Sequence, residues 1–271
     1  MSADGTRHWR FLRGAVCMFV AMYLLAPLAV VLIISFSAAP FLQFPPPGFS
    51  WRWYEQLFST PAWTNSLLTS VEILIPSSIL ATTMGTAAAY ALVRGRIPGA
   101  SAIMACLMLP ILVPGMITAT ALFGVYRGLG LNGTLTGLIT GHTILSIPYV
   151  VATIASSLRV QDARLELAAS TLGAPPWATF RRITLPLVMP AVLSSLLFAM
   201  VLSFDEFIVS LFVSSARIRP VAVQMWSNLM GDFDPTIAAI ASICFLIAFV
   251  VLLAELALRP ARPDPEPTRR R

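Results

Sequence analysis

Six long apolar stretches, separated by short polar segments, dominate the pattern of the chain. They cover residues 15–36, 65–93, 101–125, 135–158, 187–213 and 236–258. Each is long enough to cross a bilayer, because a hydrocarbon core of about 30 Å requires roughly 20 helical residues. Backbone groups in lipid must be hydrogen-bonded within their own segment, so the pattern predicts an all-α membrane protein with six transmembrane helices. The first stretch is too long for the apolar core of a cleaved signal peptide, which is about 7–15 residues.

Prolines fall inside these stretches, and a proline removes a backbone donor, so each one is predicted to break its span. They are Pro27, Pro76, Pro110, Pro114, Pro148 and Pro190. A break at membrane depth survives only where protein or water satisfies the freed carbonyls. The third stretch, with its sequence LPILVPG, is therefore a candidate for lining a path, although a packing kink explains it equally well. Gly85 with Ala81, and Gly137 with Gly141, predict close helix contacts.

The composition agrees with a membrane protein, since 57% of the residues are hydrophobic and 11% are charged. All eighteen basic residues are arginines, and fourteen of them fall in residues 1–14, 94–96, 159–182 and 259–271. Arginine-rich short loops stay on the cytoplasmic side, so both termini are predicted to be cytoplasmic. The positive charge is thus a topology signal and not a sign of nucleic-acid binding, while Arg269–Arg271 suit contact with anionic membrane lipid.

This topology assigns residues 1–14 to a cytoplasmic N-terminus and residues 37–64 to a periplasmic loop. Tryptophans in that loop suit the outer membrane interface, and a short interfacial helix is expected near residues 51–58. The Pro-rich end, residues 259–271, has no periodicity and is predicted to be a disordered cytoplasmic tail.

The predicted cytoplasmic loop at residues 159–186 is patterned unlike a linker. Residues 162–172 place apolar side chains on one helical face and end at Gly173, a residue suited to the left-handed cap conformation. A second helix is predicted to begin at Pro175 and Pro176 and to stop at Pro186. Two short helices joined by a glycine turn form a knob suited to docking another protein.

Residues in this loop resemble the EAA loop of bacterial binding-protein-dependent ABC importer permeases of type I. The matching positions are Ala168, Ala169, Gly173, Ile183, Thr184, Leu185 and Pro186. The resemblance implies the MetI-like permease architecture, with a five-helix core over residues 65–258, the first span as an extra helix, and a coupling helix seated in a groove of an ATPase subunit. The coupling residues that it implies are Glu166, Ala168, Ala169, Ser170, Gly173, Ala174, Pro175 and Trp177. The family's glutamate position holds Leu167, and Glu166 stands one residue earlier, about 100° around a helix, so Glu166 is not assumed to make the family contact.

A second resemblance narrows the branch. Residues 202–226 and 234–242 are similar to spermidine/putrescine-type permeases, in which an acidic pair is common at the place of Asp205 and Glu206. The resemblance implies a subunit of an ATP-driven polyamine importer in the bacterial inner membrane, although opine-like, aminobutyrate-like and other small solutes also fit. It implies an ATP-binding subunit in two copies, which holds the ATP and Mg, a second permease subunit that forms a heterodimer with this chain, and a soluble substrate-binding protein.

Three acids, Glu72, Asp205 and Glu206, lie at membrane depth. A carboxylate costs about 2.5–3.5 kcal/mol to insert there, so each is expected to face a cavity or a partner. Asp205 and Glu206 would point about 100° apart on a helix, which leaves open which of them faces a cationic solute. Phe204 and Phe207 suit face-on contact with an alkylammonium group or simple packing. A purely interhelical role stays open for all three acids, and His142 is expected to be an interhelical hydrogen-bonding residue.

Other function classes fit the sequence less well. The chain has no lysine, so it cannot contain the phosphate-binding loop of a nucleotide-hydrolysing subunit, and neither a cofactor nor a metal site is expected on it. An intramembrane protease would need a nucleophile with a histidine, or two aspartates on separate helices. A proton-coupled secondary transporter could use Glu72, Asp205 and His142, but it does not account for the loop at residues 159–186.

Overall fold

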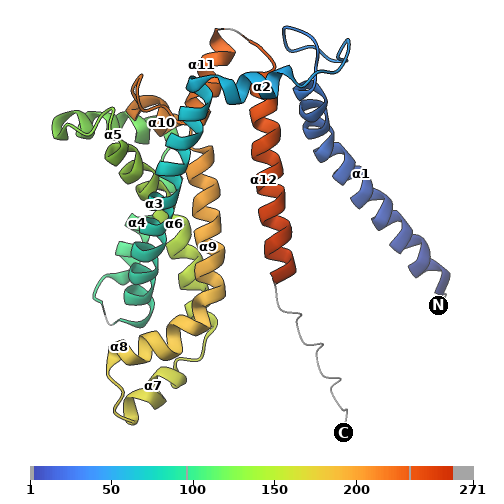
Figure 1. The fold of residues 1–271 in the computed structure, drawn as a ribbon. Coiled ribbons are helices and arrows are strands. Elements are labelled where there is room, and N and C mark those ends of the chain that lie inside the picture. The colour runs from blue at the N-terminus through green and yellow to red at the C-terminus, as the bar shows by residue number, and fades with distance from the viewer. Residues whose placement is uncertain (1–2, 96, 232, 259–271) are drawn as a thin grey trace. The chain divides into compact units, whose positions relative to one another are not determined.

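The computed structural model describes residues 3–95, 97–231 and 233–258. In this part of the chain every regular element is a helix (Figure 1), which confirms the predicted all-α class. The chain divides into two compact units, residues 61–227 and residues 1–60 with 228–271. Arg96 and the predicted tail at residues 259–271 lie outside the described residues.

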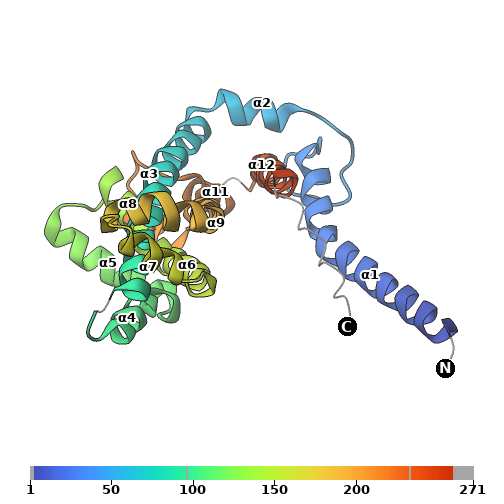
Figure 2. The ribbon, with the colours of Figure 1, turned by 90° about the horizontal axis from the view of Figure 1, so that it is seen from below.

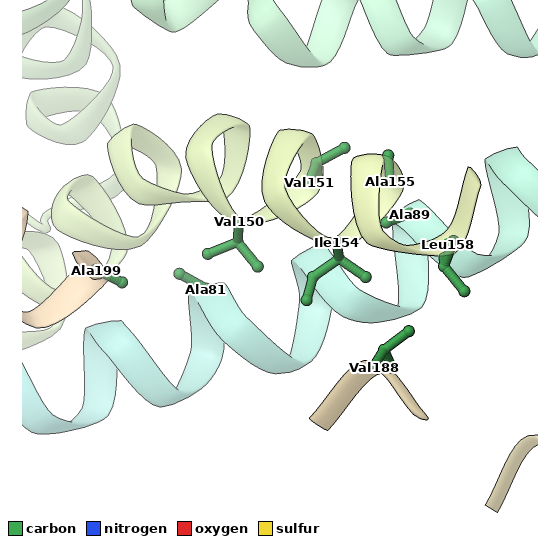
Figure 3. Packing of buried hydrophobic residues seen from close by; sticks show 9 residues of the cluster. All are labelled: Ala81, Ala89, Val150, Val151, Ile154, Ala155, Leu158, Val188 and Ala199. Atoms are coloured by element: carbon green, nitrogen blue, oxygen red, sulfur yellow. The ribbon is translucent and has the colours of Figure 1, made fainter. Parts of the chain in front are cut away.

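Three long helices form the core of the unit at residues 61–227. They are α3 (Pro61–Arg94), α6 (Leu135–Val160) and α9 (Leu185–Asp205). Their shared apolar cluster (Figure 3) consists of Ala81, Ala89, Val150, Val151, Ile154, Ala155, Leu158, Val188 and Ala199. The close approach of α3 and α6 requires Gly85, because a Cβ at this position would lie 2.6 Å from Val150 Cγ1. The predicted small-residue contact of α3 is thereby confirmed.

The third predicted span is two helices instead of one. α4 (Ala100–Leu112) and α5 (Gly115–Leu129) meet at an angle of 104°. The residue before a proline avoids the helical conformation, and Val113 is accordingly extended, with ψ at 130°. α5 then packs against α10 (Ile208–Val213), and both contribute to a second apolar cluster with α3 and α6.

The other prolines do not end their helices, so the prediction that each one breaks a span is wrong except at Pro114. The prolines inside continuous helices are Pro27, Pro76, Pro110, Pro148 and Pro190. A proline removes one backbone hydrogen bond, and in a membrane helix neighbouring helices, hydroxyl side chains and local widening compensate for it. The loss of one hydrogen bond at a proline is therefore not enough to end a membrane helix.

The predicted stop at Pro186 is also wrong. A π-helical turn, η1 (Phe180–Thr184), precedes α9, and Leu185 donates its backbone N–H to Phe180 O. Pro186 then lies in the first turn of α9, where its missing donor is not needed. The chain is consequently helical without a break from Pro176 to Asp205.

The fifth predicted span, residues 187–213, does contain a break, but at a place without proline. α9 ends at Asp205, Glu206 is extended with φ −71° and ψ 97°, and α10 begins at Ile208. The expectation of one continuous helix here is wrong, because a side-chain cap at Glu206 stabilises a new helix start, as described below.

The loop at residues 159–186 forms the expected pair of short helices. They are α7 (Arg164–Thr171) and α8 (Pro176–Thr179), and η1 continues α8 toward α9. Figure 1 and the view from below in Figure 2 place them at one end of α3, α6 and α9. Gly173 between them has φ +81°, the left-handed conformation that was predicted for it.

The second unit contains α1 (Ala3–Ser35), α2 (Arg52–Ser59) and α12 (Thr236–Leu258). α12 contacts both α1 and α2. The turn after α1 is held against α2, since Trp53 Nε1 donates to Ser37 O at 2.7 Å and the Ser35 and Tyr54 hydroxyl oxygens lie 2.8 Å apart. α2 confirms the short helix expected near residues 51–58, whereas α11 (Val221–Met230) was not predicted.

Four helical segments in the described residues are long and apolar enough to cross a membrane. They are Trp9–Ser35, Pro61–Arg94, Leu135–Val160 and Pro176–Asp205. The bent α4–α5 pair makes a fifth if its two halves count as one span. The number of six spans and the cytoplasmic position of both termini stay predictions.

Candidate functional site

A cavity of about 230 Å³ lies in the unit at residues 61–227, where the two helix breaks approach α6. Its lining includes Val113 and Gly115 from the α4–α5 break and Glu206 and Ile208 from the α9–α10 break. The polar side chains that line it are those of His142, Ser146, Tyr149, Ser203 and Glu206. Of these, Glu206 carries the carboxyl group, so the cavity combines an acid with several hydroxyl groups and an aromatic ring.

Local backbone geometry places Glu206 in this lining. The Glu206 Oε1 atom accepts a hydrogen bond from the backbone N–H of Val209 at 2.9 Å. This bond satisfies one of the free donors at the start of α10, as a helix cap does. Asp205, the last residue of α9, is exposed and is not part of the cavity lining. The two acids thus differ in environment: Asp205 ends α9 and is exposed, whereas Glu206 follows the helix and lines the cavity.

The remaining residues predicted for the path are not brought together with Glu206. Glu72 is exposed on α3. Phe207 packs its ring against Trp226, with the ring centroids 5.4 Å apart. Phe204 is half-buried, and neither phenylalanine is part of the cavity lining.

A polar network around His142 joins four helices beside the cavity, and only its histidine was predicted from the sequence. His142 is buried in α6, with Nδ1 2.9 Å from Ser203 Oγ and Nε2 2.9 Å from Ser210 Oγ. Ser203 lies in α9 and Ser210 in α10, so the imidazole bridges the helix break on both sides. Ser203 Oγ also lies 3.0 Å from Ser77 Oγ of α3. His142 is confirmed as an interhelical residue, whereas its serine partners were not predicted, although serines within apolar helices are the sequence signal for such a network.

The residues predicted for coupling divide into an outward and an inward set. Trp177 is 68% exposed and Leu172 is 87% exposed, so two large apolar side chains lie on the surface of the knob. Ala168, Ser170, Gly173 and Pro175 are also exposed, whereas Ala169 is buried and Ala174 is half-buried. The knob therefore presents an apolar surface beside the turn at Gly173.

Glu166 belongs to the inward set. Its Oε1 atom accepts hydrogen bonds from Arg94 Nε at 3.1 Å and from Thr184 Oγ1 at 3.0 Å. The side chains of Arg94 and Glu166 are 15% and 17% exposed. Leu167, which holds the position of the family's glutamate, is 64% exposed. The one-residue shift noted in the sequence therefore turns the carboxylate away from the exposed face of the knob.

Comparisons with known proteins agree with this architecture. A family model described as "Binding-protein-dependent transport system inner membrane component" matches residues 81–261. The spermidine/putrescine transport system permease protein PotC of Haemophilus influenzae is 32% identical over 92% of this chain and 97% of its own length. The putrescine transport system permease protein PotI of Escherichia coli is 31% identical over 82% of this chain and 81% of its own. In fold, the chain is similar to a chain of a bacterial ABC transporter involved in alginate import, with a TM-score of 0.75, 17% identity and coverage of 96% and 99%.

Proposed function

This chain belongs to the family of binding-protein-dependent transport system inner membrane components, and we propose on that premise that it is one permease subunit of an ATP-driven polyamine importer. As a family member it is an integral protein of the inner membrane. The relatives PotC and PotI support a substrate of the spermidine and putrescine class. Both compounds are flexible polycations, so a path for them needs carboxylate or aromatic groups where water is scarce.

The observation that carries this proposal is the position of Glu206 in the cavity. Irregular backbone at membrane depth is tolerated where it lines a cavity or is buried in protein, and two breaks from different spans line this one. A carboxylate at this depth is costly when no positive charge faces it, whereas an ammonium group in the cavity would offset the cost. Glu206 thus suits transient contact with one ammonium group of a polyamine.

The coupling loop, defined as residues 159–186, is the proposed docking site for the ATPase. Its apolar surface at Leu172 and Trp177 suits a hydrophobic groove on a partner. The absence of lysine from the chain supports ATP binding and hydrolysis on a separate subunit, present in two copies with its ATP and Mg. The family description itself names a binding protein, which supports a soluble partner that delivers the substrate. A second permease subunit would complete the path.

Uptake by reconstituted complexes tests the proposal. Vesicles would contain this chain with its ATPase and second permease, with the binding protein and labelled spermidine or putrescine added outside. Glu206→Gln keeps an oxygen that can accept from Val209 N–H and removes only the charge. A charge-assisted contact is worth about 1.5–3 kcal/mol, so uptake should fall by roughly one to two orders of magnitude at subsaturating substrate.

Asp205→Asn is the matched control, because it removes the same charge from the neighbouring, exposed residue. It should retain most of the uptake, and substrate binding by the soluble receptor should be unchanged in both variants. Unlabelled spermidine should compete with the labelled substrate, whereas opines and aminobutyrate should not. Normal uptake in Glu206→Gln, or an equal loss in Asp205→Asn, contradicts the role of Glu206, and competition by opines instead of polyamines contradicts the substrate class.

A further inference from the structure

We infer that Glu166 and Arg94 form an internal tie that connects the coupling loop to the long helices of its own chain, so that Glu166 is a positioning residue and not a contact to the ATPase. The inference rests on the proposed docking of an ATPase at this loop. It assigns a role to a carboxylate that the sequence places one residue away from the family pattern.

One carboxylate oxygen joins three elements at this place. Glu166 Oε1 belongs to α7, Arg94 Nε donates to it from the end of α3, and Thr184 Oγ1 donates to it from η1. Arg94 Nη2 also donates, at 3.2 Å, to the backbone oxygen of Gln161, the residue directly after α6. The helices α3, α6 and α9 all build the apolar cluster of Figure 3, so the tie reaches each of them or the segment next to it.

The surroundings of this tie differ from those of an ordinary surface ion pair. Exposed pairs contribute little, because water screens them and their side chains lose entropy. Arg94 and Glu166 are at most 17% exposed, and Thr184 is 1% exposed. Charge-assisted hydrogen bonds in such a place are stronger than neutral ones, and leaving one partner alone is unfavourable.

An aromatic contact runs parallel to the tie, one helical turn away. Tyr90 stands four residues before Arg94 on α3, and its ring centroid lies 4.8 Å from that of Phe180 in η1. Phe180 in turn stacks on Trp177 of α8 at 5.8 Å. Trp177 is the exposed residue that the proposed ATPase would contact. Movement of the loop would therefore reach α3 through an ionic contact from α7 and an aromatic contact from α8.

The decisive experiment separates docking from coupling in the reconstituted complex. Arg94→Ala, Glu166→Gln and Thr184→Val would each be measured for ATPase binding, substrate-stimulated ATP hydrolysis and uptake. With the tie weakened, the ATPase should still bind with unchanged affinity, while solute moved per ATP hydrolysed should fall about fivefold to tenfold in Arg94→Ala and less in Thr184→Val. A contact to the ATPase would instead weaken binding.

Arg127→Ala is the matched control, because Arg127 is likewise an arginine in the last turn of a helix, α5, but is exposed and lies outside the coupling loop. It should retain normal coupling. The exchanged pair Arg94→Glu with Glu166→Arg should recover at least part of the lost coupling, which neither single charge reversal does, whereas failure of the exchange to recover any coupling overturns the tie.

Two further outcomes separate the inference from its premise. Wild-type coupling in both Arg94→Ala and Glu166→Gln overturns the tie and leaves the proposed docking intact. Failure of the unmodified chain to bind an ATPase overturns the proposed function itself.

Discussion

Replacing His142 by leucine tests whether the imidazole holds the break between α9 and α10. Leucine has a similar size and no polar atoms, so the variant removes two hydrogen bonds, to Ser203 and to Ser210, both at 2.9 Å. Hydrogen bonds between membrane helices contribute about 0.6 kcal/mol on average and up to about 1.7 kcal/mol, so the loss should be about 1–3 kcal/mol. Ser210 is fully buried, which favours the upper part of this range.

Two further variants show how much of the lost stability belongs to the hydrogen bond with Ser203 and how much to the one with Ser210. An asparagine amide reaches the place of the histidine Nδ1 atom, whereas a glutamine amide reaches that of Nε2. His142→Asn should therefore retain the contact to α9 through Ser203, and His142→Gln the contact to α10 through Ser210. Each should restore part of the stability that His142→Leu loses.

The measurement is unfolding of the solubilised complex by a denaturing detergent, with polyamine uptake as the functional readout. Thr143→Val is the control, because the Thr143 hydroxyl donates to Ile139 O of its own helix at 2.7 Å and, at 3.4 Å, to Ser77 O of α3. It touches neither α9 nor α10 through this group. The reasoning fails if His142→Leu unfolds like the wild type, or if Thr143→Val loses as much stability.

Substitutions at Gly85 and at Gly173, each with a control variant, extend the test to packing and to the loop. Gly85→Ala places a Cβ 2.6 Å from Val150 Cγ1 and should destabilise the α3–α6 contact by about 1–3 kcal/mol in the same unfolding measurement. Its control is Gly124→Ala in α5, where a Cβ meets nothing within 4 Å, so this variant should be neutral or slightly stabilising. Gly173→Val forces a β-branched residue into a backbone with φ +81°, a strain of about 1–2 kcal/mol. ATP hydrolysis should lose its coupling to uptake in Gly173→Val more than in Gly173→Asn, since asparagine tolerates this conformation, and equal coupling in both variants would contradict the role of the turn.

The long helices could be predicted from the sequence because their signals are local. The lengths of the apolar stretches gave α3 and α6 within a few residues, and the glycine at position 173 marked the end of α7. These features depend on hydrophobicity and on backbone preference within a few neighbouring residues. Prolines were a less reliable signal, because whether a helix continues through one depends on what surrounds it.

The break at Glu206 could not be predicted because its local cause, a side-chain cap, carries no proline or glycine signal and its other cause is distant along the chain. The sequence around it contains neither proline nor glycine. Its stabilising partners are a cap on Val209 and an imidazole that reaches Ser203 and Ser210 from 61 and 68 residues earlier. The orientation of Glu166 likewise depends on residues far from it in the sequence. A helical wheel separates Glu166 from Leu167 by about 100°, but the contacts that hold Glu166 inward come from Arg94, 72 residues before it, and from Thr184, 18 residues after it.

The break at Glu206 and the coupling loop are joined by one continuous helix. The segment from Pro176 to Asp205 is 30 residues long, which corresponds to about 45 Å at 1.5 Å per residue. One end carries Trp177 and the tied residue Thr184, and the other end leads directly into Glu206 at the cavity. A helix transmits displacement along its axis, whereas a flexible loop absorbs it, so an ATPase that moves α8 would also move the start of the break. The hydrogen bonds of His142 to Ser203 and Ser210 would connect α6 to this movement, because they hold α6 to both sides of the break.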